Sequence, residues 1–197
     1  PDGIAGIKGR IFGDFQGRNA ATGILAAVKY LQRNKLNEIS AKIKKGISNV
    51  KINSGYKGRL EHIRKNGTDY IFDISHNTEG VRTALEALGK NKLDLVIFGI
   101  MEDKDYKSAL KVILRHTDNI IFTKPQYYRS LDPAVLMNLA VKTHTNEFLN
   151  LFLANDMKEA VKIAVSLSIK PTRVLVIGSF FLVSDAVKAF RFQKYFN

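Results

Sequence analysis

Hydrophobic positions near the start of the chain repeat with the period of an α-helix. Between Asn19 and Gln32 they fall about 3.6 residues apart, which predicts an amphipathic helix. The predicted apolar stripe consists of Ala20, Ile24, Ala27, Val28 and Leu31. A second short helix is expected from Asn37 to Lys45, ended by Gly46, because glycine commonly follows the last helical turn.

The pattern then changes from helical to alternating. Residues 49–57 are polar and end among glycines, so we interpret them as a linker between two domains. Apolar and polar residues alternate over 59–64, and a second strand is expected over 70–73. Asn66 and Gly67 between them are the residues that a tight turn favours, which predicts a β-hairpin. The hairpin should bring Arg59 and Asp73 together at its open end.

Strands and helices alternate through the rest of the chain. We expect strands over 93–98, 119–123, 147–152 and 173–177, and helices over 78–89, 106–115, 133–142 and 157–168, with a last helix ending at Ala189. Apolar strands separated by helices of this length predict an α/β fold, in which helices cover both faces of a mostly parallel sheet opened by the hairpin.

Ligands of such folds bind beyond the carboxyl ends of the strands. Four segments are expected there: 73–77, 99–105, 123–130 and the pair Gly178 and Ser179. The first combines a carboxylate (Asp73), a hydroxyl (Ser75), an imidazole (His76) and an amide (Asn77), which suits a ribose and an anion. The alternative is that Asp73 or Asn77 caps the next helix and His76 is a surface residue. Capping alone also explains Asp105.

The composition of the chain excludes some kinds of functional site and leaves others open. The chain has no cysteine, which excludes disulfides, thiolate metal sites and cysteine nucleophiles. It has no apolar run of eighteen residues and no basic and apolar leader pattern, so we expect a cytoplasmic protein with no membrane partner. The formal net charge of +13 fits nucleic acid, an anionic membrane surface or small polyanionic substrates, and does not choose among them.

Five short motifs in order resemble the C-terminal part of folylpolyglutamate and dihydrofolate synthases, in the Mur ligase superfamily. They are residues 16–20, 58–61, 73–77, 98–105 and 178–183. The resemblance runs from about Gly13 to Lys188. One departure is the sequence Asp-Ile-Ser-His-Asn-Thr at 73–78, where the family usually has Asp-Gly-Ala-His-Asn-Pro.

The resemblance implies a Rossmann-like C-terminal ligase domain at 58–197. Residues 1–48 would then be the tail of the preceding ATPase domain, and 49–57 the linker. It also implies an ATP-dependent ligase that activates a carboxylate as an acyl phosphate and joins it to the amino group of glutamate. The family's phosphate-binding loop is absent from these residues. With the start at Pro1 in a glycine-rich patch, this leads us to expect a fragment that is inactive alone.

Site roles follow from the resemblance, residue by residue. Asn19 would bind the adenine of ATP, Arg59 its phosphates and Asp73 its ribose. His76 and Ser179 would position the incoming glutamate. ATP and Mg²⁺ are the implied cofactors, with the metal ligands outside this chain.

The implied small-molecule partners are ATP, glutamate and folate or dihydropteroate, and we expect a monomer. Two further readings stay open. One is a dihydrofolate synthase or another Mur-type amino-acid ligase. The other is a non-catalytic nucleic-acid-binding domain, suggested by the basic and aromatic segment at 124–129. It is less favoured because basic residues do not gather on one predicted element.

Overall fold

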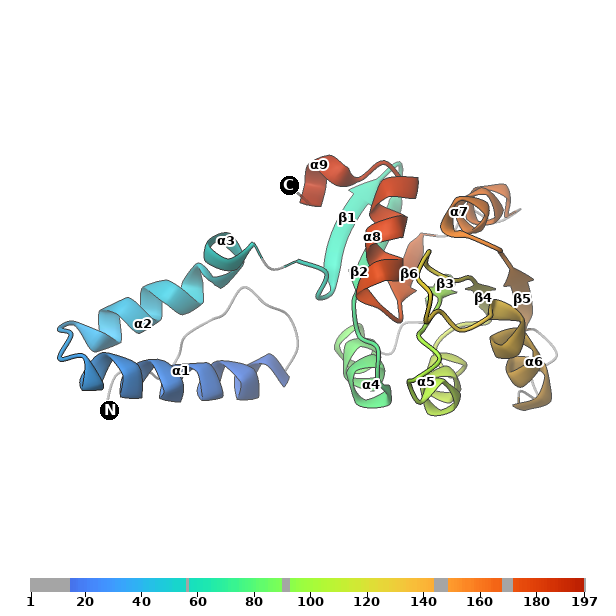
Figure 1. Cartoon of the computed structure of the whole chain (residues 1–197). Coiled ribbons are helices and arrows are strands. Elements are labelled where there is room, and N and C mark those ends of the chain that lie inside the picture. Colours follow the sequence, from blue (N-terminus) through green and yellow to red (C-terminus); the bar gives the residue numbers. More distant parts are fainter. Residues whose placement is uncertain (1–14, 56, 90–92, 144–148, 168–171, 197) are drawn as a thin grey trace. The chain divides into compact units, whose positions relative to one another are not determined.

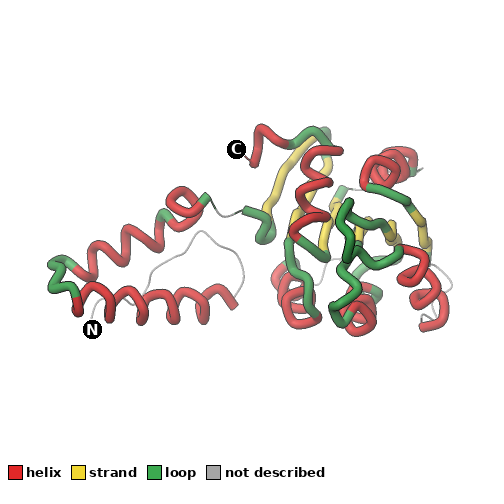
Figure 2. The backbone as a smooth tube through the Cα atoms, viewed as in Figure 1, coloured by secondary structure: helices red, strands yellow, loops and turns green. Residues whose placement is uncertain are grey.

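The structure is a computed structural model that describes residues 15–55, 57–89, 93–143, 149–167 and 172–196. It divides into two compact units, Pro1–Lys57 and Gly58–Asn197. Among the described residues the first unit contains helices joined by turns and no strand, and every strand lies in the second unit (Figure 2). The two units are therefore described one at a time.

The first unit contains α1 (Phe15–Arg33), α2 (Ile39–Ser48) and α3 (Val50–Ser54). The five positions of the predicted apolar stripe are the half-buried side chains of α1 between Gly17 and Arg33. In α2 only Ile43 is fully buried. The amphipathic helix predicted from the sequence is thus confirmed, and it begins a turn earlier than expected.

One local prediction in this unit is wrong. Gly46 does not end the second helix, which continues to Ser48. The helix ends at Asn49, whose backbone N–H and side-chain amide both donate to the carbonyl of Lys45 (3.2 and 3.0 Å). A glycine inside a helix costs only about 1 kcal/mol relative to alanine, so one exposed glycine does not stop it. The sequence pattern did not predict α3, which lies within residues 49–57. That these residues form a linker stays a prediction.

The second unit is built on a six-stranded sheet in the order β1-β2-β6-β3-β4-β5. The strands are β1 (Glu61–Lys65), β2 (Thr68–Asp73), β3 (Leu95–Phe98), β4 (Asn119–Phe122), β5 (Asn150–Leu153) and β6 (Arg173–Ile177). β1 and β2 are antiparallel, and all the other pairs are parallel. The hairpin and the mostly parallel sheet agree with the prediction.

Helices cover both faces of this sheet (Figure 1). They are α4 (Thr78–Ala87), α5 (Tyr106–Ile113), α6 (Pro133–Thr143), α7 (Met157–Ser166), α8 (Phe180–Ala189) and α9 (Gln193–Phe196). α4, α5 and α6 pack on one face, with buried side chains such as Leu85, Leu110 and Leu136. α7 and α8 pack on the other, through Ala160 and Leu182 among others. The α/β fold class is therefore confirmed.

Strand residues alternate between the two faces. Ile71 and Leu175 belong to the core under α4 to α6, whereas their neighbours Phe72 and Val176 belong to the core under α7 and α8. Both faces are apolar because both are covered, which is why these strands appear in the sequence as continuous hydrophobic runs.

No helix within the described ranges is long and apolar enough to cross a membrane.

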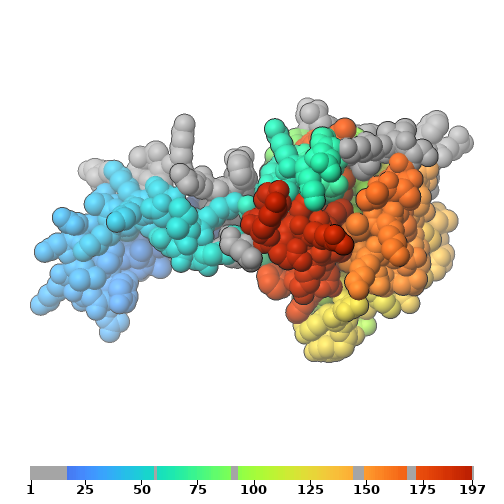
Figure 3. Space-filling view, turned by 90° about the horizontal axis from the view of Figure 1, so that it is seen from above, coloured from blue at the N-terminus to red at the C-terminus, as the bar shows by residue number. Residues whose placement is uncertain are grey.

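The C-terminal segment of the second unit packs beside the hairpin (Figure 3). Phe190 and Phe192 stack on each other with centroids 5.6 Å apart, and both contact Tyr70 and Phe72 of β2. Phe196 of α9 meets Phe72 edge to face. The sequence pattern did not predict α9, whose four residues are too few for a helical period.

Candidate functional site

The carboxyl ends of four parallel strands share one edge of the sheet. β2 ends at Asp73, β6 at Ile177, β3 at Phe98 and β4 at Phe122. The register pairs Asp73 with Ile177, so the Gly178–Ser179 turn follows directly beside the Asp73 loop. All four sequence segments singled out as ligand-binding candidates leave the sheet at this edge.

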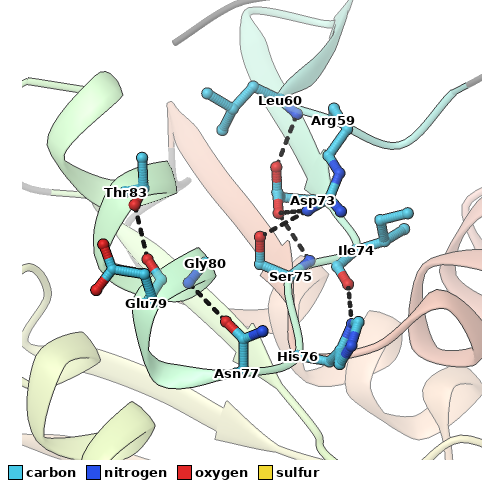
Figure 4. Close-up of polar contacts among 10 residues, drawn as sticks. All are labelled: Arg59, Leu60, Asp73, Ile74, Ser75, His76, Asn77, Glu79, Gly80 and Thr83. Carbon is cyan, nitrogen blue, oxygen red and sulfur yellow. Dashed lines mark hydrogen bonds and ion pairs between the residues drawn. The ribbon is translucent and has the colours of Figure 1, made fainter. Parts of the chain in front are cut away.

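Asp73 organises the loop at the end of β2 (Figure 4). Its side chain is fully buried. One carboxylate oxygen accepts the backbone N–H of Leu60 (3.0 Å) and the other accepts the N–H of Ser75 (2.8 Å). The hairpin brings the two segments together as predicted. Because the carboxylate is buried and bonded to the backbone, its observed contacts fix the loop.

Leu60 carries a strained backbone at this point. Its φ of 46° lies in the left-handed region, which is unfavourable for a bulky side chain by roughly 1–2 kcal/mol. The hydrogen bond to Asp73 and the burial of the leucine side chain hold it there. Such strained residues cluster at functional sites. Sequence reasoning did not identify Leu60.

Arg59 lies against the same loop. Its Nη1 donates to the Ser75 hydroxyl (3.0 Å) and lies 3.9 Å from an oxygen of Asp73. The side chain remains 23% exposed. Arg59 is thus a charged, planar donor that is anchored to the loop and remains partly exposed. The sequence analysis noted the Ser75 hydroxyl but not its bond to Arg59, which is 16 residues away along the chain.

His76 and Asn77 follow on the outer side of the loop (Figure 4). His76 is exposed, and its Nδ1 lies 3.2 Å from the carbonyl oxygen of Ile74. A carbonyl can only accept, so Nδ1 carries the hydrogen in this contact and Nε2 faces outward without restraint from it. Asn77 caps α4 by accepting the N–H of Gly80 (2.7 Å). The capping alternative is therefore confirmed for Asn77.

Ser179 begins α8 at the next strand. It is buried, and its hydroxyl oxygen accepts the N–H of Leu182 (2.9 Å), which makes it the N-cap of the helix. The hydroxyl hydrogen is not used in that bond, so it can still donate.

Asn19 lies on α1 in the other unit, and the structure gives no geometry that relates it to this loop.

Two glycines let the neighbouring strand ends converge. A Cβ on Gly99 would lie 2.3 Å from the backbone oxygen of Thr123, and one on Gly178 would lie 2.3 Å from the oxygen of Gly99. Neither position has room for a side chain. Glycine at both positions therefore allows the backbones of neighbouring strand ends to approach closely.

The segment after β3 contributes charge and a second cap. Asp105 accepts the N–H of Ser108 (3.1 Å) and begins α5, as expected. Asp103 pairs with Lys104 (2.9 Å) and with Arg129 (3.7 Å). The hydrogen bond from Lys104 lowers the pKa of the Asp103 carboxyl. Across the described ranges, no three His, Cys, Asp or Glu side chains gather in a group that could hold a metal ion.

Comparison with known proteins identifies this fold. The Mur ligase, glutamate ligase domain matches residues 58–180. Among solved structures, the chain is similar to Mycobacterium tuberculosis folylpolyglutamate synthase complexed with ADP. The TM-score is 0.72 at 20% identity, over 93% of this chain and 41% of that one.

Two further structures are similar. Thermotoga maritima folylpolyglutamate synthase gives a TM-score of 0.64 at 27% identity, over 92% of this chain and 40% of that one. The bifunctional folylpolyglutamate synthase/dihydrofolate synthase from Yersinia pestis, complexed with AMPPNP and Mn ion, gives 0.57 at 20% identity, over 79% and 35%. This chain spans less than half the length of each enzyme. The domain match covers most of the chain and lies within the second unit, so the chain belongs to the Mur ligase family through its glutamate ligase domain.

Proposed function

We propose that this chain is the C-terminal part of an ATP-dependent ligase that adds glutamate to folate, as a folylpolyglutamate synthase does. The family match supports ligase chemistry, and the structural neighbours at 20–27% identity motivate the folate substrate. The observation that carries the proposal is the Arg59 guanidinium, held beside a strained and buried loop at the carboxyl edge of the sheet.

The proposed reaction has two steps. A carboxylate oxygen of the substrate attacks the γ-phosphorus of ATP, which forms an acyl phosphate and releases ADP. The amino group of glutamate then attacks the acyl carbon, the bond to the phosphate oxygen breaks, and an amide and inorganic phosphate are formed. Each step brings two bound reactants together, so the protein acts by orientation and by charge stabilisation. Orientation alone can lower a barrier by about 7–11 kcal/mol.

Arg59 is proposed to contact the ATP phosphates. A guanidinium is permanently charged and presents several N–H donors in one plane, which suits phosphate oxygens. Its bond to Ser75 uses Nη1 and limits the directions in which the side chain can point. Such preorganisation reduces the entropy lost when a ligand is bound.

Asp73 is proposed to act first through the loop it fixes. A direct contact with ribose remains a prediction, and it requires the buried carboxylate to become accessible. His76 and Ser179 are proposed to position glutamate, with the outward Nε2 of His76 and the hydroxyl hydrogen of Ser179 as the available groups. Asn19 is proposed to bind adenine from the other unit.

The proposed reaction also involves a metal ion, Mg²⁺. Mg²⁺ would neutralise phosphate charge in such a reaction. The described residues do not form a fitting donor set, so no ligand is assigned here and no step depends on one. The domain organisation, with residues 1–48 belonging to the preceding ATPase domain, is likewise a proposal, as are a cytoplasmic location and a monomeric state.

The experiment that tests this function is an assay of glutamate incorporation by the protein that contains this chain with its preceding domain. We expect ATP-dependent transfer of labelled glutamate to folate, which Arg59→Ala reduces by at least tenfold. Arg64→Ala is the matched control, because Arg64 lies exposed on β1 of the same hairpin. Transfer to dihydropteroate alone would assign the dihydrofolate synthase alternative. Equal losses in the two variants would contradict the proposed role of Arg59.

A further inference from the structure

Four aromatic rings form a continuous row beside Ser179. Phe181 of α8 stacks on Tyr127 with centroids 4.1 Å apart and planes 14° from parallel. Tyr128 lies next to Tyr127, with ring centroids 4.7 Å apart, and Phe180 meets Phe181 edge to face (6.0 Å). We call Phe180, Phe181, Tyr127 and Tyr128 the aromatic row.

The row is exposed although its rings are large. Tyr128 is 83% exposed, Phe180 62% and Phe181 39%. Removing these rings from water would be favourable. A contiguous exposed apolar surface of this kind usually marks a binding site. The two most exposed rings are the ends of the row, where a further ring could stack.

The loop that carries the tyrosines is held in place by polar contacts. The N–H of Gln126 donates to Asp185 of α8 (3.1 Å), and the Ser130 hydroxyl donates to the carbonyl of Pro125 (2.8 Å). The N–H of Glu102 donates to the carbonyl of Arg129 (2.9 Å), which ties the loop to the segment after β3. The row is therefore preformed, so a ligand need not pay to order it.

A cation accompanies the rings. The Arg129 guanidinium lies 5.5 Å from the ring centre of Tyr127 and 5.7 Å from that of Tyr128. The hydrogen bond with Arg129 lowers the pKa of the Tyr127 phenol, which reflects the same proximity. Tyrosine rings with an arginine beside them are the combination on which planar conjugated rings stack.

We propose that the aromatic row is a stacking site for a planar conjugated ring of a small-molecule ligand. This rests on the proposed function, under which the substrates carry two kinds of ring: the aminobenzoyl and pteridine rings of folate, and the adenine of ATP. The row begins one residue after Ser179, at the edge of the sheet where the candidate site lies. A ring held there would orient its attached group toward that edge.

Charge argues against a nucleic-acid strand on the same surface. Carboxylates lie against the residues that hold the aromatic row: Asp103 pairs with Arg129, and Asp185 accepts the N–H of Gln126. Glu102 and Asp132 lie exposed next to these segments. A phosphate backbone needs a track of unopposed basic side chains, whereas one ring needs only the stack.

The test is isothermal titration calorimetry of this chain with three probes. Para-aminobenzoylglutamate represents the folate source, AMP represents the nucleotide source, and free glutamate lacks a ring. Tyr128→Ala removes the most exposed ring, and Tyr128→Phe keeps the ring without its hydroxyl. Tyr195→Ala is the matched control, since Tyr195 is an exposed tyrosine of the same unit with Lys194 over its ring.

We expect para-aminobenzoylglutamate to bind, with a dissociation constant raised about fivefold or more by Tyr128→Ala and unchanged by Tyr128→Phe or Tyr195→Ala. If Tyr128→Ala weakens the binding of AMP and not that of para-aminobenzoylglutamate, the stacking site is supported and its ring is assigned to the nucleotide. Absence of binding by both ring probes, equal binding of glutamate, or equal affinities in Tyr128→Ala and Tyr195→Ala would overturn the proposal.

A thymidine oligonucleotide that binds through Tyr128 while both small ring probes fail would also overturn it, in favour of nucleic acid. These titrations need no catalysis. A failure here therefore leaves the glutamate-incorporation assay unaffected, and a failure of that assay does not by itself remove binding to the row.

Discussion

At the scale of single residues, the candidate site depends on contacts between segments distant in sequence. Leu60 is held in a left-handed conformation by Asp73, and Arg59 is held by Ser75. Ser75 stands where the resembled family pattern has alanine, so the bond to Arg59 is a feature of this sequence. Thr78 stands where that pattern has proline, and its hydroxyl donates to the carbonyl of Asp105 (3.5 Å).

The anchoring of Arg59 gives the first prediction. Ser75→Ala should raise the KM for ATP about fivefold in the protein that contains this chain, because one hydrogen bond to a charged group is lost at a partly exposed site, roughly 1 kcal/mol. The KM for glutamate should stay within twofold. Steady-state kinetics with each substrate varied in turn measure the split. Equal effects on both substrates would indicate a general disturbance of the loop.

His76 gives a prediction about glutamate binding, where the previous prediction concerned ATP. His76→Ala should raise the KM for glutamate about tenfold, since the imidazole is exposed beside the loop and available to an anionic amino acid. ATP binding should change little, because Arg59 and its contact with Ser75 are untouched. The same assay measures it, with His116→Ala as control. A rise in the KM for ATP with unchanged glutamate kinetics would count against the assignment.

At the scale of elements, the sequence pattern predicted the hairpin, the alternation of strands and helices, and the caps at Asn77 and Asp105, because each depends on neighbours in sequence. It missed α3 and α9, which are too short to show a period. It also missed the anchoring of Arg59, since no local rule pairs residues 16 apart. Part of the predicted strand at 147–152 and the end of the helix predicted to 168 lie outside the described residues.

Asp94 joins two elements at the opposite edge of the sheet. Its carboxylate accepts the N–H and hydroxyl of Thr172 (2.8 and 2.6 Å) and the N–H of Arg173 (2.9 Å), which fixes the start of β6 beside β3. Burial raises the pKa of Asp94, but the hydrogen bonds from Thr172 and Arg173 outweigh it and leave the pKa lowered.

This contact predicts a pH dependence of stability. With the folded pKa below the unfolded value of about 3.9, the contribution of Asp94 is present above pH 4 and is lost as the pH falls through the folded pKa. Asp94→Asn should therefore cost about 1 kcal/mol at pH 7, an amount discounted for exposure, and progressively less below pH 4. Urea unfolding at several pH values measures the difference. A pH-independent difference would show that ionisation of Asp94 does not contribute.

The convergence of strand ends gives a prediction for glycine. Gly99→Ala should destabilise the second unit by about 2–4 kcal/mol, because the new Cβ would meet a backbone oxygen that cannot move without displacing β4. Gly46→Ala is the control, since nothing lies within 4 Å of a Cβ there and α2 should gain up to about 1 kcal/mol. Thermal unfolding compares them. A neutral Gly99→Ala would contradict the close packing of β3 and β4.

At the scale of the whole molecule, the net charge of +13 suits a protein whose proposed substrates are all anions. The structural neighbours are more than twice as long as this chain, so the complete reaction is proposed for the protein that contains it. The second unit is proposed to supply the Arg59 loop and the glutamate-positioning groups, and the phosphate-binding loop and metal ligands are expected outside these residues.

The most direct test of the account follows oxygen through the reaction. A folate substrate labelled with ¹⁸O in its γ-carboxylate is incubated with ATP, glutamate and the protein that contains this chain, and the released phosphate is analysed by mass spectrometry. An acyl phosphate intermediate predicts one ¹⁸O atom in each phosphate, because the oxygen that joins the acyl carbon to phosphorus leaves with the phosphate. Amide formation that releases unlabelled phosphate would contradict the proposed mechanism.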